Sequence, residues 1–213
     1  MTSDHNKIIS AEARAALGPI GCIRVGRSRL WLDDHGWWVG IVEFQPSGWT
    51  KGSYLNVATS WLWHEDNPLA FSESWGERPF HEYESDVQFC AAMRSHAALA
   101  KDEILRMRDR FASLELVASH LGARNIGNIW CDYDAAIAFG LLGNTKMSAE
   151  RFEAVLAANH AVEWVDALKE KVRKLIPLTG SSMAFRTTIA SMVASARSKA
   201  KLPQLPQDID FAP

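Results

Sequence analysis

The chain has 213 residues, of which 47% are hydrophobic and 23% charged, with a formal net charge of −2 and a pI near 6.4. This composition is typical of a globular protein with a sizeable core and excludes a chain that is disordered throughout. A charge so close to neutrality gives no overall field toward nucleic acid, which is therefore not expected as a partner. No apolar run approaches the ~20 residues that cross a bilayer, so no membrane association is expected either.

The cysteines Cys22, Cys90 and Cys131 are far apart and odd in number. None lies in a CxxC pair or in a Cys/His cluster with the spacing of a zinc site. Together with a start that does not resemble a signal peptide, this usage predicts a reduced, cytoplasmic setting. We expect no metal or other cofactor.

The first part of the chain predicts a short helix followed by a β-meander. Residues 8–17 form the helix, which Gly18-Pro19 ends. Strands are predicted over 29–33, 37–45 and 53–63, where apolar and polar residues alternate, and 71–75 predicts a fourth, edge strand. Seven of the nine tryptophans lie between Trp31 and Trp75, so this meander is the aromatic centre of the chain.

From Ser85 the apolar period changes from two to 3.6, which predicts one long helix that ends at Gly122. Further helices are predicted over 129–142, over 148–176 with a break near Asn159-His160, and from Ser181 or Ser182 to about 202. The expected fold class is α+β: an N-terminal helix on a three- to five-stranded antiparallel β-meander, followed by a mostly α-helical C-terminal half. Residues 1–84 form the sheet region and 85–213 the helical region, packed as one integrated unit because no Pro/Ser/Gly linker separates them.

The tryptophans suggest a binding surface. Trp37 and Trp38 are adjacent in a strand and must point to opposite faces, so at least one lies outside the shared core. Trp49 lies in a Pro/Gly loop, and Trp61 lies in the third strand. An exposed aromatic ledge for a ligand or a partner protein is one interpretation; the other is that the tryptophans form the core and rim of the sheet.

Polar residues on the same strands extend this candidate surface. The binding candidates are Arg24, Arg27, Arg29 and Asn56, beside Trp37, Trp49 and Trp61. The alternative is that these charges form cross-strand ion pairs on a solvated sheet face, each worth a few tenths of a kcal/mol.

A catalytic interpretation rests on Asp34 followed by Glu43-Phe44-Gln45 across the first hairpin. This order resembles the Asp…Glu-x-Lys/Gln signature of restriction-endonuclease-like nucleases. In those enzymes two carboxylates hold Mg²⁺ and the third residue positions the attacking water. The usual Lys is Gln45 here and the turn between the strands is short, and any hairpin can show this pattern by chance.

One further resemblance covers residues 8–64. Gly21, Arg24 and Gly26, then Arg29-Leu30-Trp31, then the strand from Trp38 to Gln45 with Ser47, then Tyr54-Leu55-Asn56-Val57, are similar to a bacterial family of small domains of unknown function. Its members begin with a helix and a Gly-x-x-Arg segment, followed by a hairpin and an aromatic-x-Asn strand. The resemblance implies a cytoplasmic bacterial protein with an α+β sheet domain. It brings no activity and no catalytic residue.

Three functions follow from these observations. The favoured one is a non-catalytic binding or protein-interaction module that uses the aromatic and polar sheet face. The alternatives are a metal-dependent, nuclease-like hydrolase centred on Asp34, Glu43 and Gln45, and a small-molecule sensor. The expected partner is another protein or a small ligand, and a homodimer stays open.

Overall fold

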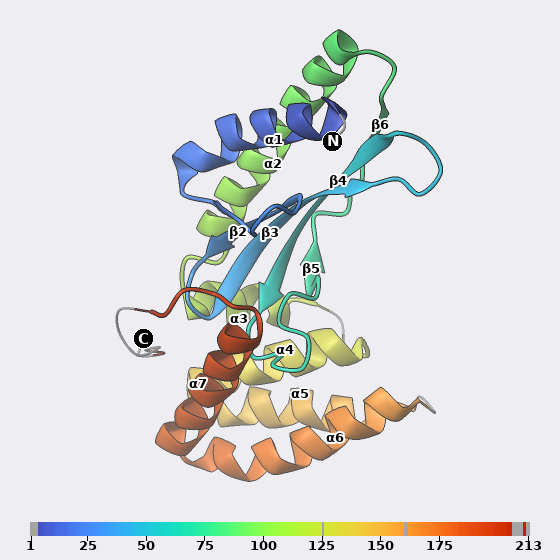
Figure 1. Ribbon diagram of the computed structural model, residues 1–213. Helices are drawn as coiled ribbons and strands as arrows, with labels where there is room; N and C mark the ends of the chain where they lie inside the picture. Colours follow the sequence, from blue (N-terminus) through green and yellow to red (C-terminus); the bar gives the residue numbers. More distant parts are fainter. Residues whose placement is uncertain (1–3, 125, 160–161, 206–210, 212–213) are drawn as a thin grey trace. The chain divides into compact units, whose positions relative to one another are not determined.

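The computed structural model describes residues 4–124, 126–159, 162–205 and 211 (Figure 1). The chain divides into two compact units. The first consists of Met1–Leu62 and Asn67–Asp109, and the second of Trp63–Asp66 and Arg110–Pro213. The predicted α+β class is confirmed: an N-terminal helix precedes an antiparallel sheet, and the C-terminal half is helical. That the chain packs as one integrated unit stays a prediction.

The sheet of the first unit is antiparallel throughout. Its strands β1 to β5 lie side by side in chain order, and the short strand β6 also pairs with β4. The three predicted strands and the edge strand are present, whereas β6 was not predicted because three residues are too few to show a period of two. The strands are β1 (Ile23–Arg24), β2 (Leu30–Asp34), β3 (Trp38–Pro46), β4 (Gly52–Trp61), β5 (Glu73–Ser74) and β6 (Phe80–Glu82).

The register gives the sheet two chemically different faces. Val42 lies opposite Val57, and the next residues, Glu43 and Asn56, lie opposite each other. Because side chains alternate along a strand, the valines and the polar pair point to opposite faces. We call the side that carries Glu43, Gln45, Tyr54 and Asn56 the polar face.

Helix α2 (Asp86–Arg110) covers the other face. The Thr59 hydroxyl lies 3.4 Å from the Met107 sulfur. Gly40 is required where α2 crosses β3, since a Cβ there would lie 2.8 Å from the Ile104 Cδ1. Helix α1 (Asp4–Leu17) lies beside α2 (Figure 1). Glu12 of α1 forms an ion pair with Arg94 of α2.

The single long helix predicted from Ser85 to Gly122 is in fact two helices. Helix α2 ends at Arg110, and α3 (Leu114–Gly122) begins after Ser113, whose extended backbone and hydroxyl cap the new helix by accepting from the Leu116 N–H. Phe111, just after α2, and Leu114, at the start of α3, are both buried. The spacing of the apolar residues therefore continues through a segment whose backbone is not helical.

The second unit is helical and is built around α4 (Ile129–Leu141), which contacts α3, α5 and α7. Its buried residues point in all directions, as expected for a central helix. The break predicted near Asn159-His160 lies between the end of one helix at Ala157 and the start of the next at Glu163. His160 itself lies outside the described residues. No helix in the described ranges is long and apolar enough to cross a membrane. The other helices are α5 (Thr145–Ala157), α6 (Glu163–Leu175) and α7 (Ser182–Lys199), with the 3-10 turns Gly18–Ile20 and Ile176–Gly180.

Candidate functional site

A gap between β5 and β6 opens a pocket on the polar face. The Trp75 N–H donates to the Val57 carbonyl at 2.9 Å, and the Leu55 N–H donates to the Pro79 carbonyl at 3.0 Å. Between these two bonds, residues 76–78 leave the edge of β4, and Gly76 turns the chain with a φ of +98° that other residues rarely adopt. The segment therefore arches over the strand beside Asn56.

The pocket has a volume of about 300 Å³. This is at the small end of the range for ligand sites in proteins. All of its lining residues belong to the first unit. They are Glu43, Gln45, Asn56, Val57, Phe71, Ser74, Gly76, Glu77 and Arg78.

The Asn56 amide organises the floor of the pocket. Its Nδ2 donates to Glu43 Oε2 at 2.9 Å and to Gln45 Oε1 at 2.8 Å. Its Oδ1 accepts from Arg78 Nε at 2.9 Å, and Arg78 Nη2 also donates to Gln45 Oε1. Both amide hydrogens and the carbonyl are thus used, which fixes the orientation of the Asn56 side chain.

Arg78 is exposed, but its guanidinium group is held in a defined position. Its guanidinium carbon lies 4.4 Å from the centroid of the Tyr54 ring, at cation–π distance. The contact with the ring and the two hydrogen bonds together orient the planar guanidinium group over β4. This restricts a side chain that is otherwise rich in rotamers.

Glu43 and Arg78 carry opposite charges and share Asn56 as a hydrogen-bond partner, yet they form no ion pair with each other. Neither is paired with any other charged side chain among the residues that the structure describes. The lining of the pocket therefore holds three charged residues, Glu43, Glu77 and Arg78. Asn56 keeps the Glu43 carboxylate and the Arg78 guanidinium group apart, and Glu77 is exposed.

The structure brings together two of the three nuclease-like candidates and separates the third. Glu43 and Gln45 are neighbours on the same face of β3, and both accept hydrogen bonds from Asn56. Asp34 lies opposite Val39, and Glu43 lies opposite Leu30. Asp34 is therefore four residues from Glu43 along the strands, roughly 13 Å at ~3.3 Å per residue.

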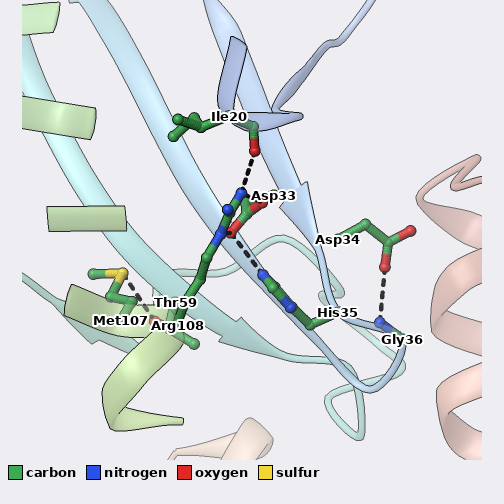
Figure 2. Close-up of polar contacts among 8 residues, drawn as sticks. All are labelled: Ile20, Asp33, Asp34, His35, Gly36, Thr59, Met107 and Arg108. Carbon is green, nitrogen blue, oxygen red and sulfur yellow. Dashed lines mark hydrogen bonds and ion pairs between the residues drawn. The ribbon is translucent and has the colours of Figure 1, made fainter. Parts of the chain in front are cut away.

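Asp34 has a local role instead, because its carboxylate accepts from the Gly36 N–H at 3.0 Å in the hairpin turn (Figure 2). Over the described ranges, no group of three or more His, Cys, Asp and Glu side chains is arranged to hold a metal ion.

The three candidate arginines do not share a surface site. Arg24 donates to the carbonyls of Arg27 and Ser28 and closes the turn after β1. Arg29 contacts His5 and Asn6 of α1 and donates to the Phe44 carbonyl, and its partial burial lowers its pKa. Arg27 is exposed.

The predicted aromatic ledge is not continuous. Trp61 is fully buried, and its ring stacks on that of Trp37 with centroids 6.0 Å apart. Trp49 is 94% exposed, in the loop between β3 and β4. Of the three candidate tryptophans, only Trp49 offers an open aromatic surface.

A second polar cluster of the first unit lies at the β2–β3 hairpin (Figure 2). Arg108 of α2 and His35 of the turn both contact the buried Asp33 carboxylate, with His35 Nε2 at 2.7 Å. Burial raises the pKa of Asp33, but the hydrogen bonds from His35 and Arg108 outweigh it, so the pKa is lowered overall. Arg108 also donates to the Ile20 carbonyl, and the cluster fastens α2 to the hairpin and to the segment after α1.

The thiol of Cys22 lies near this cluster but is not a nucleophile. Burial, followed by the negative charge of Asp33, raises its pKa to about 12. Only the thiolate attacks an electrophile. Cys22 therefore behaves as a small core residue.

Sequence reasoning missed Arg78, because no motif or spacing points to it. It lies in a loop, 22 positions after Asn56, and only the return of the chain to β4 at Pro79 brings its side chain over the strand.

No protein-family model matches this chain, and neither a curated protein nor a solved structure is detectably similar to it. The resemblance over residues 8–64 therefore stays a prediction. Function has to be inferred from the pocket and its chemistry.

Proposed function

We propose that this chain is a non-catalytic binding module of the bacterial cytoplasm, and that its polar sheet face binds a small molecule in the pocket beside Asn56. The observation that carries this proposal is the row of hydrogen bonds from Glu43 through Asn56 and Gln45 to Arg78, along a cavity of about 300 Å³. A few fixed polar groups in a concave site are the usual means of orienting a small ligand.

The lining of the pocket favours binding over catalysis. Its nine residues include no His, Cys or Lys, and Ser74 provides its single hydroxyl group. A nucleophile needs an adjacent base to be activated, and none of the lining residues offers Ser74 an imidazole. The bacterial, cytoplasmic setting is supported by the sequence resemblance and by the cysteine usage.

The test is a thermal-shift screen of small polar metabolites against wild type, Asn56→Ala and, as a matched control, the exposed Asn67→Ala. A compound present at 100 times its Kd stabilises the native state by about 2.7 kcal/mol. For a chain of this length that corresponds to a rise in Tm of roughly 5–10 °C. We expect at least one compound to give such a shift with wild type and Asn67→Ala but not with Asn56→Ala. A panel without any shift, or a shift that survives Asn56→Ala, would contradict the proposal.

Trp49 supports a second candidate function, contact with a partner protein. Its indole is 94% exposed at the tip of the β3–β4 loop. The Ser47 hydroxyl accepts from the N–H groups of Trp49 and Thr50 and so shapes this loop. Tryptophan is enriched among the residues that dominate binding energy at protein interfaces.

This second function can be tested with a photo-reactive amino acid placed at position 49, and separately at the exposed position 87 as a control. Irradiation in cells should join the position-49 protein to one discrete partner, or to a second copy of this chain. Equal products from both positions, or none from position 49, would argue against it.

A further inference from the structure

Two of the three charged residues that line the pocket, Glu43 and Arg78, are linked through Asn56 and indicate the class of its ligand; the third, Glu77, is exposed. We propose that the pocket binds a small zwitterion, of which a free α-amino acid is the simplest form, with its ammonium group at Glu43 and its carboxylate at Arg78. This inference rests on the proposed function, namely that the pocket takes a small molecule.

Glu43 provides the site for a cation. One of its oxygens accepts from Asn56 at 2.9 Å, and no positively charged side chain among the described residues neutralises it. Its residue is half-buried on β3 and lines the cavity. A half-buried carboxylate gains most from a cationic donor, because charge-assisted hydrogen bonds are roughly twice as strong as neutral ones.

Arg78 provides the site for an anion. Two of its N–H groups donate to the neutral amide oxygens of Asn56 and Gln45. A guanidinium group has five such donors, so the others are available for a carboxylate. Two parallel donors match the two oxygens of a carboxylate, and the Tyr54 ring keeps this fork in place.

Asn56 gives the pocket its specificity for both charges at once. It bonds to Glu43 through Nδ2 and to Arg78 through Oδ1, and so holds the two groups apart instead of letting them neutralise each other. A neutral ligand would leave both groups unmatched, and a singly charged one would leave one unmatched; such unmatched groups cost affinity. Phe71, 42% exposed at the same cavity, offers an apolar contact for the remainder of the ligand.

The test is isothermal titration calorimetry of the full chain with the twenty protein amino acids, β-alanine and 4-aminobutanoate. For each of these compounds, whether or not it binds, the amine without its carboxylate and the acid without its amino group are titrated as well. The panel also includes neutral polar compounds such as sugars and amides. We expect at least one amino acid to bind, and each singly charged analogue to bind 10- to 100-fold more weakly, as for the loss of a charged hydrogen bond of ~1.5–3 kcal/mol.

Two variants assign the two ends of the ligand. Glu43→Gln should weaken the amino acid and the amine at least tenfold while leaving the acid analogue unchanged. Arg78→Gln should weaken the amino acid and the acid analogue at least tenfold while leaving the amine unchanged. The exposed Glu82→Gln and Arg27→Gln serve as controls of matched chemistry, and circular dichroism checks that every variant is folded.

The outcomes separate this inference from the proposed function. If only amines, only acids or only neutral compounds bind, and Asn56→Ala abolishes that binding, the pocket is a ligand site but the zwitterion inference is wrong. If none of the panel binds, both fail. Amino-acid binding that is unchanged in Glu43→Gln and Arg78→Gln would also overturn the inference, because the ligand would then lie elsewhere.

Discussion

Arg108 donates two hydrogen bonds to the carboxylate of Asp33, from Nη2 to Oδ1 at 2.6 Å and from Nε to Oδ2 at 2.9 Å. The two residues are 75 positions apart in the chain, on α2 and β2. Asp33 is only 5% exposed. The bidentate geometry is the strongest form of such a contact, and it joins the helix to the sheet of the first unit.

Replacing Arg108 by alanine should destabilise the first unit by about 2–3 kcal/mol. The change removes the guanidinium group that neutralises the buried Asp33 carboxylate and leaves it the hydrogen bond to His35. An uncompensated buried charge is costly. Urea unfolding monitored by circular dichroism measures the effect. Arg94→Ala, which removes an exposed ion pair from the same helix, should change the midpoint little. Equal effects of the two substitutions would show that the Arg108–Asp33 contact does not stabilise the fold.

His96 should make the stability of the first unit depend on pH. Its side chain is buried on α2, and neither ring nitrogen has a hydrogen-bond partner within the part of the chain that the structure describes. Its ring lies 4.7 Å from that of His81. Burial, followed by the charge of His81, lowers its pKa from 6.5 to about 4. The unfolded chain thus binds a proton between these values and the native state does not.

The expected stability is therefore complete above about pH 6.5 and falls as the pH is lowered toward 4. The loss due to His96 is at most about 3 kcal/mol, because one pKa unit corresponds to ~1.4 kcal/mol. Urea unfolding at pH 7.5, 5.5 and 4.5 should show a weaker pH dependence for His96→Met than for wild type. His120→Met, in the second unit, should leave the dependence as in wild type. An unchanged slope in His96→Met would contradict the assignment.

The buried ion pair of Arg151 with Asp132 should be essential to the second unit. Arg151 Nη1 donates to Asp132 Oδ1 at 2.7 Å, and both side chains are almost fully buried. Arg151 also donates to the carbonyls of Gly122 and Arg124, and so ties α5 to the end of α3.

Arg151→Met should cost about 3–5 kcal/mol, because it leaves the Asp132 charge buried and unpaired. The double variant Arg151→Met/Asp132→Ala should lose less stability than the sum of the losses in the two single variants. Arg173→Met, which breaks an exposed pair in the same unit, should have a small effect. Thermal unfolding of the four variants measures these differences, and a strictly additive double variant would show that the two side chains do not interact energetically.

The sequence predicted the chemistry of each sheet face because alternation is a local property. The order Val42-Glu43 and Asn56-Val57 is enough to place the valines and the polar pair on opposite faces, and the register confirms it. The break between α2 and α3 was missed for a related reason. Phe111 and Leu114 are both buried, so the apolar spacing runs through a backbone that is no longer helical.

The candidate site depends on contacts that spacing cannot reveal. The turn at His35-Gly36 sets Asp34 opposite Val39, so the carboxylates of Asp34 and Glu43 are far apart although their order in the sequence fits a nuclease. Conversely, Arg78 joins Asn56 only because residues 76–78 arch over β4. Strand faces follow from neighbouring residues, but pockets follow from register and loop path.

Gly140 marks a close approach of two helices in the second unit that should not tolerate a methyl group. A Cβ at this position of α4 would lie 2.6 Å from Cε1 of Phe185 on α7, and 3.0 Å from the Ser148 hydroxyl. Phe185 is fully buried, so its ring has little room to move.

Gly140→Ala should therefore destabilise the second unit by about 1–2 kcal/mol, even though alanine is the better helix former by ~1 kcal/mol. Gly180→Ala is the matched control, since a Cβ there meets no heavy atom within 4 Å, and it should change stability little. Combining Gly140→Ala with Phe185→Leu should cost less than the two single changes together, because the smaller side chain relieves the contact. Thermal unfolding measures all four proteins. A Gly140→Ala protein as stable as wild type would mean that α4 and α7 do not pack as closely as the Phe185 contact indicates.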